Sequence, residues 1–260
     1  MDNFTKQYFE RCLTEFSQYG FKKHGNAFVR VINDVFQNFY LEKLGTYSYG
    51  RECRIGFAVL PLCQKNLDER ILNGVGLYYL RGFERSHWSQ ADRWRYEVNI
   101  IDSIIDDIMR YFKQYLIPFF ERANSCETAF DALVDLEKHF NETRLMNLSS
   151  AGINDARSEV ISFDSAKFFM ALKNRNYDFA LAIKKMLLQQ NIDALASVIN
   201  GGFLTEKALT ERETNLEAIR GEIKRLEERD EKYFQDIILE YEAHSKEILK
   251  SIINAASKKT

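Results

Sequence analysis

Apolar positions in the first 140 residues change their spacing twice. Residues 3–19 repeat them every three or four positions, as one helix face does, and Gly20 follows as a left-handed stop. From residue 27 the chain instead holds β-like runs at 27–32, 35–44, 53–62 and near 93–98, with a tight turn expected at Asn33 and Asp34. The helical period returns from residue 99 to residue 140, where Pro118 is expected to kink or end a helix. The pattern predicts an α+β fold, with an antiparallel sheet of about four strands packed by helices at 3–19 and 99–140.

The second half of the chain is predicted to be all helical. Residues 141–163 are polar and indicate a linker after an α+β domain of residues 1–140. Residues 164–202 predict a helical hairpin that turns at residues 174–176, with a short helix at 193–199. Residues 203–260 predict a long coiled-coil-like helix, although its apolar stripe changes phase near Asp230. A single helix of this length exceeds what a compact domain covers, so it is expected to meet a partner chain or to fold back as a hairpin.

The apolar stripe of this predicted helix is a candidate for self-association. Its members are Leu209, Leu216, Ile219, Ile223, Leu226 and Ile237. Because such a stripe is typical of helices that pack together, it indicates a possible homodimer through residues 203–260.

Composition and charge narrow the class of protein. The 260 residues are 45% apolar and carry 36 Lys and Arg against 38 Asp and Glu, which argues against a polybasic nucleic-acid binder and against an acidic disordered chain. No stretch approaches the roughly 18 apolar residues of a membrane span, and the first 20 residues do not have the pattern of a secretory signal. We therefore expect a cytoplasmic protein without a membrane partner.

Motifs of the common enzyme classes are missing from the sequence. The four cysteines, Cys12, Cys53, Cys63 and Cys126, form no C-x-x-C pair and have no histidine at zinc-finger spacing, so they are expected to be buried. Phosphate-binding loops, serine-nucleophile elbows and zinc-hydrolase helices are not found either. The sequence thus predicts no metal and no cofactor. It leaves enzymatic activity undecided, because a convergent site needs no motif.

Residues 81–96 interleave arginine with aromatic side chains. The candidate binding residues here are Arg81, Arg85, Trp88, Arg93, Trp94 and Arg95. Arginine and aromatic faces stack on nucleic-acid bases and also dominate protein interfaces, so the stretch fits either kind of partner. The alternative is that both tryptophans anchor the core and the arginine stems pack over them.

A second set of candidate binding residues lies around the first turn of the sheet. Lys22, Lys23 and His24 stand between Gly20 and Gly25, where they form either a solvated turn or a cationic lip for an anionic group. Gln37 and Lys43 are polar positions of the second β-like run, and they face either a cleft or solvent. The set of candidates is therefore Lys22, Lys23, Gln37 and Lys43.

The same region carries a resemblance to a known family. The sequence Gly-Phe-Lys-Lys-His-Gly begins at Gly20, Asp-Val-Phe-Gln-Asn-Phe-Tyr-Leu-Glu-Lys begins at Asp34, Arg-Ile-Gly-Phe begins at Arg54, and Ile-Pro-Phe-Phe-Glu begins at Ile117. In this combination residues 3–140 resemble a bacterial domain of unknown function, family 4304. The resemblance implies an opening helix, a strand meander and a later helix with a Pro-Phe-Phe element. It implies no activity, and it does not extend to the C-terminal helices.

Taken together, the sequence favours a non-enzymatic, cytoplasmic protein-binding module of the adaptor or toxin-neutralising type. Its partner is expected to be a protein that meets the Arg/Trp stretch and the helical tail. The alternatives are a nucleic-acid-binding or nucleic-acid-processing protein and a small-molecule enzyme with an unrecognised site. A nucleic-acid partner is less favoured, because the surplus of positive charge in residues 1–96 is modest.

Overall fold

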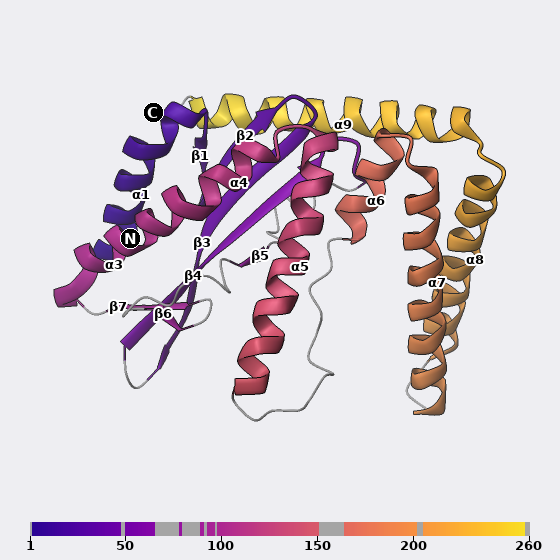
Figure 1. Ribbon diagram of the computed structural model, residues 1–260, viewed down its shortest axis with the longest axis horizontal. Coiled ribbons are helices and arrows are strands. Elements are labelled where there is room, and N and C mark those ends of the chain that lie inside the picture. Colours follow the sequence, from indigo (N-terminus) through magenta and orange to yellow (C-terminus); the bar gives the residue numbers. More distant parts are fainter. Residues whose placement is uncertain are drawn as a thin grey trace.

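The computed structural model describes residues 2–47, 50–65, 78–79, 89–90, 93–96, 98–150, 164–201 and 205–257. An antiparallel sheet is covered by helices, and a helical hairpin extends away from it (Figure 1). The strands are β1 (Lys22–His24), β2 (Ala27–Ile32), β3 (Val35–Tyr47), β4 (Gly50–Pro61), β5 (Tyr78–Tyr79), β6 (Ser89–Gln90) and β7 (Arg93–Tyr96). The α-helices are α1 (Asn3–Phe16), α3 (Ile101–Tyr111), α4 (Ile117–Arg122), α5 (Cys126–Ser150), α6 (Asp164–Lys173), α7 (Tyr177–Asn200), α8 (Glu206–Glu227) and α9 (Glu231–Ser257). The α+β class predicted from the sequence is confirmed.

The sheet has the strand order β1-β2-β3-β4-β7-β6, and β5 pairs with β4. The predicted tight turn joins β2 to β3, with Asn33 at a φ of 50°. The four predicted runs coincide with β2, β3, β4 and β7, while the additional strands are short: β1 has three residues, and β5 and β6 have two each. The sheet therefore has more strands than the four predicted, because short edge segments add to the predicted ones.

β3 is much longer than its neighbour β2. The register pairs β2 with β3 only from Val35 to Tyr40, whereas β3 and β4 remain paired to the end of β3 at Tyr47. From Leu41 onward, β3 and β4 therefore continue as a ribbon past the shorter β1 and β2 (Figure 1).

Helices α1, α3 and α4 cover one face of the sheet with an aromatic core. The ring of Phe39 on β3 meets Phe16 of α1 at 5.4 Å between centroids and Phe112 at 4.9 Å. Each of these side chains is buried, and burial of an aromatic ring is among the largest single contributions to a core. The apolar side chains that recur every three or four positions in residues 3–16 and 101–112 are thus the ones that pack on this face of the sheet.

Pro118 does not end the helix in which it lies. Residues Phe112–Leu116 form a π-helical segment between α3 and α4, and Pro118 falls in the first turn of α4. A proline is tolerated there because its missing N–H is one that a helix start leaves without an intrahelical partner. The expected break is therefore a local widening of the helix, which keeps Phe112 and Phe120 buried on the sheet.

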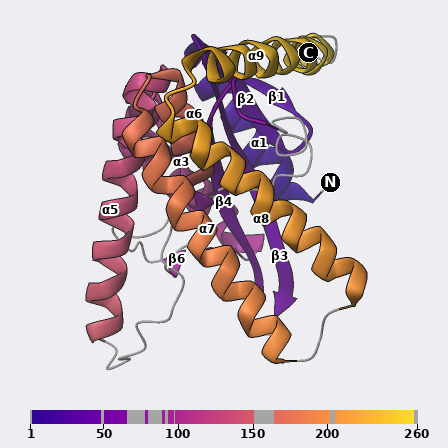
Figure 2. The same ribbon diagram turned by 90° about the vertical axis from the view of Figure 1, so that its right-hand side faces the viewer.

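The C-terminal helices form a second core around α6, α7, α8 and α9. Phe168 of α6, Tyr177 of α7, Leu226 of α8 and Phe234 of α9 are buried in this cluster. α9 lies across the top of the molecule in Figure 1 and reaches β1, and its Leu249 is buried in the core of the sheet. Figure 2 shows α7 and α8 side by side as a hairpin, with α9 above them. Among the described helices, none combines the length and the hydropathy that a membrane crossing requires.

The predicted single helix of residues 203–260 is corrected to two helices. α8 ends at Glu227 and α9 begins at Glu231, after a turn in which Arg229 has a φ of 52°. The amide of Asp230 donates to the carbonyl of Arg225 at 3.0 Å, which closes the end of α8. The break lies where the apolar stripe changes phase, and α9 turns away from α8 to run across the top of the molecule, so the two helices form neither one coiled coil nor a hairpin with each other (Figure 1).

Two predicted boundaries are also corrected. α5 continues through Ser150, so the first part of the predicted linker at 141–163 is helical, while residues 151–163 lie outside the described part of the chain. The predicted hairpin of residues 164–202 is present as α6 and α7, joined at residues 174–176. The short helix expected at 193–199 is the last part of α7, because no glycine or proline interrupts the helix before Gly201.

Candidate binding surfaces

The lysines at the first turn of the sheet point to its two faces. Lys22 and Lys23 are adjacent residues of β1, so their side chains alternate, and Lys23 is in register with Phe28 of the aromatic face. The ammonium group of Lys23 lies 4.2 Å from the centre of the Phe9 ring on α1. Gly25 has a φ of 57°, which a glycine adopts without strain, and it turns the chain from β1 into β2.

Lys43 of β3 lies beside the N-terminus of α1. It forms an ion pair with Asp2, the residue that caps this helix. Its ammonium group is 2.8 Å from Asp2 Oδ2, and the guanidinium of Arg51 is 3.8 Å from the same oxygen. Asp2 Oδ1 in turn accepts hydrogen bonds from the amide and the hydroxyl of Thr5, at 2.9 and 2.6 Å. Burial alone would raise the pKa of Asp2, but the hydrogen bonds from Lys43 and Thr5 outweigh it and hold that pKa well below its ordinary value.

A pocket of about 470 Å³ lies between α1 and β3, and it is the candidate site that these lysines define. Phe9 and Leu41 give it an apolar lining, and both side chains are almost completely buried. Lys43 lines the pocket directly, while Lys23 lies over its Phe9 wall. Of the residues predicted from the sequence, Lys43 lines this pocket and Lys23 contacts Phe9, one of its lining residues; we name the pocket the edge pocket.

Gln37 does not face a cleft, and this expectation is wrong. Its side chain is 0% exposed and lies between the sheet and α4. Its Oε1 accepts a hydrogen bond from Arg30 Nε at 2.6 Å, and its Nε2 donates to the carbonyls of Phe120 and Ala123 at 2.8 and 2.7 Å. Gln37 is thus a structural residue that joins two strands to the end of α4.

The Arg/Trp stretch is only partly described, and its described tryptophan belongs to the core. Trp94 is 1% exposed, and its indole N–H donates to Asp107 at 2.8 Å, so its predicted place on a binding surface is wrong. Arg95 is exposed but pairs with Glu52 at 2.8 Å. Arg93 belongs to β7, and Arg81, Arg85 and Trp88 lie outside the described residues.

Most of the residues predicted for self-association are covered within the chain itself. Leu216, Ile219, Ile223 and Leu226 of α8 are buried, which corrects the expectation of an uncovered stripe. α8 packs along α7, and Lys185 of α7 pairs with Glu227 of α8 at 2.8 Å. Leu209 on α8 and Ile237 on α9 are half-buried.

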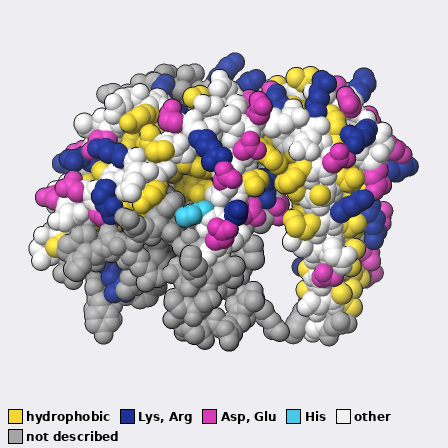
Figure 3. Space-filling view, in the orientation of Figure 1, with side chains coloured by type: hydrophobic (Ala, Val, Ile, Leu, Met, Phe, Trp, Pro, Cys, Tyr) yellow, Lys and Arg dark blue, Asp and Glu magenta, His cyan; other side chains and the backbone are white. Residues whose placement is uncertain are grey.

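The outer half of the α7–α8 hairpin differs from its base. Between Ile183 and Leu216, none of the described residues is buried, although seven of them are Leu, Ile or Val. On α7, Met186 is 39% exposed and Ile199 is 52% exposed. Hydrophobic side chains are visible along the hairpin at the right of Figure 3.

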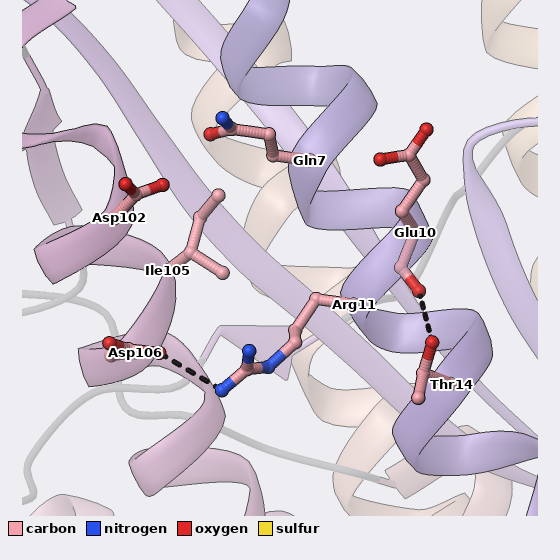
Figure 4. A pocket seen from close by; sticks show the side chains of 7 residues that line it. All are labelled: Gln7, Glu10, Arg11, Thr14, Asp102, Ile105 and Asp106. Carbon is pink, nitrogen blue, oxygen red and sulfur yellow. Dashed lines mark hydrogen bonds and ion pairs between the residues drawn. The ribbon is translucent and has the colours of Figure 1, made fainter.

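A polar groove of about 400 Å³ separates α1 from α3 (Figure 4). Arg11 spans it and binds Asp106 of α3 at 3.1 Å and Glu15 at 2.6 Å. Burial raises the pKa of Glu15, but Lys113 and Arg11 more than offset this and lower it. The ion pairs at this groove therefore fix α1 against the neighbouring helix. They also account for the positions of Glu15 and Asp106 without a ligand.

The described cysteine, histidine and acidic side chains do not form a metal site. All four cysteines are free and buried, as predicted, and burial raises the pKa of the Cys12 and Cys53 thiols. Within the described ranges, no three His, Cys, Asp or Glu side chains gather in a way that would hold a metal ion.

Comparison of the chain with protein-family models, with curated proteins and with solved structures finds no match. The resemblance to bacterial family 4304 thus stays a prediction that depends on the motifs quoted above.

Proposed function

We propose that the chain is a protein-binding module of the adaptor or toxin-neutralising type, without catalytic activity of its own, and that it works in the cytoplasm. Its partner is a protein that packs on the outer half of the α7–α8 hairpin. The four free, buried cysteines support a reducing compartment.

The observation that carries the proposal is the exposure of this half of the hairpin. Leu188, Ile192 and Leu195 on α7 are half-buried and follow one another at steps of four and three residues, and Ile199 continues the series. Such steps place side chains along one side of a helix, which is how a helix is recognised by a groove or by another helix. α8 packs along α7 and leaves these side chains only half covered, so a third helix from a partner would complete the packing.

The energy of such an interaction is adequate for specific binding. Complete burial of a Leu or Ile side chain contributes about 1.5–3 kcal/mol, and these side chains have part of that burial still to gain. A row of partly exposed apolar side chains along one helix is therefore a candidate interaction site on this folded protein.

The test compares two variants of the full chain that gain the same charge on α7. In Leu195→Glu the charge falls in the stripe, whereas in Ala196→Glu it falls on a neighbouring exposed position. Tagged protein is recovered from its own cytosol, and bound macromolecules are identified and quantified. We expect a stoichiometric protein partner with the unchanged chain and with Ala196→Glu, and its loss with Leu195→Glu.

Helix content measured by circular dichroism shows whether both variants remain folded. A partner that stays bound to folded Leu195→Glu contradicts the proposal, as does a chain that recovers nuclease-sensitive nucleic acid in place of a protein. A second copy of this chain could also be the partner that packs on this surface. Light scattering would then find a dimer that Leu195→Glu converts to a monomer.

A further inference from the structure

The edge pocket lies where β3 has no neighbouring strand on one side. β2 begins at Ala27, opposite Tyr40, and in the described part of the chain no strand pairs with β3 beyond Tyr40 on this side. β3 nevertheless keeps its extended conformation to Tyr47, because β4 holds it from the other side. The sheet thus has a notch, bounded at one end by the turn of Gly25 and Asn26.

The backbone of β3 points into this notch. The amide of Leu41 is directed at the carbonyl of Asn26, at 3.5 Å, and so it faces the β2 side of the strand. In a β-strand the N–H and C=O groups alternate sides with a period of two residues, so those of Lys43 face the same side. Extended backbone with outward polar groups is the usual template for the addition of another strand.

The side chains beside the notch add a second element of recognition. Leu41 and Lys43 lie on the face of β3 that α1 covers, and both line the edge pocket together with Phe9 and Thr5. An added strand would therefore place every second side chain over this pocket. An apolar side chain fits the Phe9 and Leu41 lining, and its neighbours two positions away come close to Lys23 and Lys43.

The charge around the pocket favours an acidic occupant. Lys23, Lys43 and Arg51 bring three positive charges, and Asp2 brings one negative charge that Lys43 and Arg51 share. Glu42 forms an ion pair with Arg54 at 2.8 Å, so this pair is neutral as a whole. The described residues around the pocket thus carry a net positive charge.

We propose that this notch binds an acidic peptide segment in extended conformation, which adds to β3 as a strand antiparallel to it and in line with β2. The recognised pattern is an apolar residue flanked at two positions on each side by Asp or Glu. The site is separate from the α7–α8 hairpin, so either proposal can fail while the other stands.

The probe is a fluorescein-labelled peptide of sequence Thr-Glu-Thr-Val-Thr-Glu-Thr, titrated with the full chain up to about 1 mM at low salt and followed by fluorescence anisotropy. The matched control peptide replaces both Glu by Lys. We expect saturable binding of the acidic peptide and at least about tenfold weaker binding of the basic one. Equal binding of the two peptides, or no binding of either, overturns the proposal.

Two peptides with a single N-methyl group test the strand pairing itself. One carries the methyl group on the amide of Val and the other on the amide of the preceding Thr. In an added strand only one of these two amides faces β3, so one methyl group should weaken binding by about tenfold or more and the other should leave it within about threefold. Equal effects of both methyl groups contradict strand addition.

Two lysine variants locate the site. Lys43→Ala removes a charge from the pocket, while Lys207→Ala removes one from an exposed position of α8. We expect a loss of about two- to fivefold with Lys43→Ala and no change with Lys207→Ala. An equal response of the two variants overturns the assignment. So does a single-stranded oligonucleotide that displaces the peptide.

Discussion

Replacing Gln37 by leucine removes the amide that joins β2 and β3 to the end of α4. Three hydrogen bonds are lost, one from Arg30 and two to the carbonyls of Phe120 and Ala123. A neutral hydrogen bond contributes about 1 kcal/mol and one with a charged partner about 1.5–3 kcal/mol, and the groups left behind remain buried. These contributions sum to about 3.5–5 kcal/mol, and after about 1 kcal/mol is subtracted for the gain from an apolar side chain, Gln37→Leu should lower the free energy of unfolding by about 2.5–4 kcal/mol.

Urea unfolding followed by tryptophan fluorescence measures this change, because Trp94 is buried in the same sheet. Arg30→Met serves as the control background, since the guanidinium is then no longer left without its acceptor. In the Arg30→Met background, Gln37→Leu should lower the free energy of unfolding by less than it does in the unchanged chain. The reduction should be about 1.5–3 kcal/mol, and it measures the coupling between the two residues. A cost below about 1 kcal/mol for Gln37→Leu alone would refute the structural role assigned to this residue.

Two further substitutions test a helix cap and a helix interior. Asp2→Ala should lower stability by about 1 kcal/mol near neutral pH, because it removes the cap of α1, whereas Asp2→Asn should cost less. The folded pKa of Asp2 is depressed, so this stabilisation is present above its ordinary value of 3.8 and is lost as the pH falls below it; urea midpoints of variant and unchanged chain should converge there. Gly221→Ala on α8 should raise stability by about 0.5–1 kcal/mol, since a Cβ atom would meet nothing within 4 Å and alanine favours the helix, and a lower thermal midpoint would contradict this.

The elements of the fold followed from local periodicity, and the turn after α6 was predicted at residues 174–176, but the end of α8 was not predicted. The turn after α6 and the turn after α8 each place an arginine, Arg175 and Arg229, at a φ above 50°. Glycine is the usual residue at such a position, so Arg229 is no stop signal for α8. At α8 the exposed pair between Arg229 and Asp178 of α7, at 2.9 Å, helps to hold the turn. The change of phase near Asp230 was the one local sign of the break, and Asp230 accepts from the amide of Tyr233 at the start of α9.

The candidate site was predictable only in part, because it depends on strand lengths. Lys23 and Lys43 were identified by their charge, yet their common pocket arises from α1, which packs across both strands. The buried role of Gln37 had a signal in the sequence, since the tight turn at Asn33 places Arg30 opposite residue 37 in the hairpin. Its two carbonyl partners lie more than 80 residues away, and no local pattern indicates them.

The position of α9 decides how the two binding proposals can be separated. α9 contributes Phe234 to the helical core and Leu249 to the core of the sheet, and Lys173 of α6 pairs with its Glu242. Removal of residues 203–260 would therefore uncover both cores, and a loss of binding would then report unfolding instead of a lost interface. Single substitutions on the outer half of α7 and at the edge pocket avoid this, because they change side chains at a solvent boundary. Residues 203–260 thus belong to the framework that supports both proposed binding surfaces, the outer half of the α7–α8 hairpin and the notch beside β3.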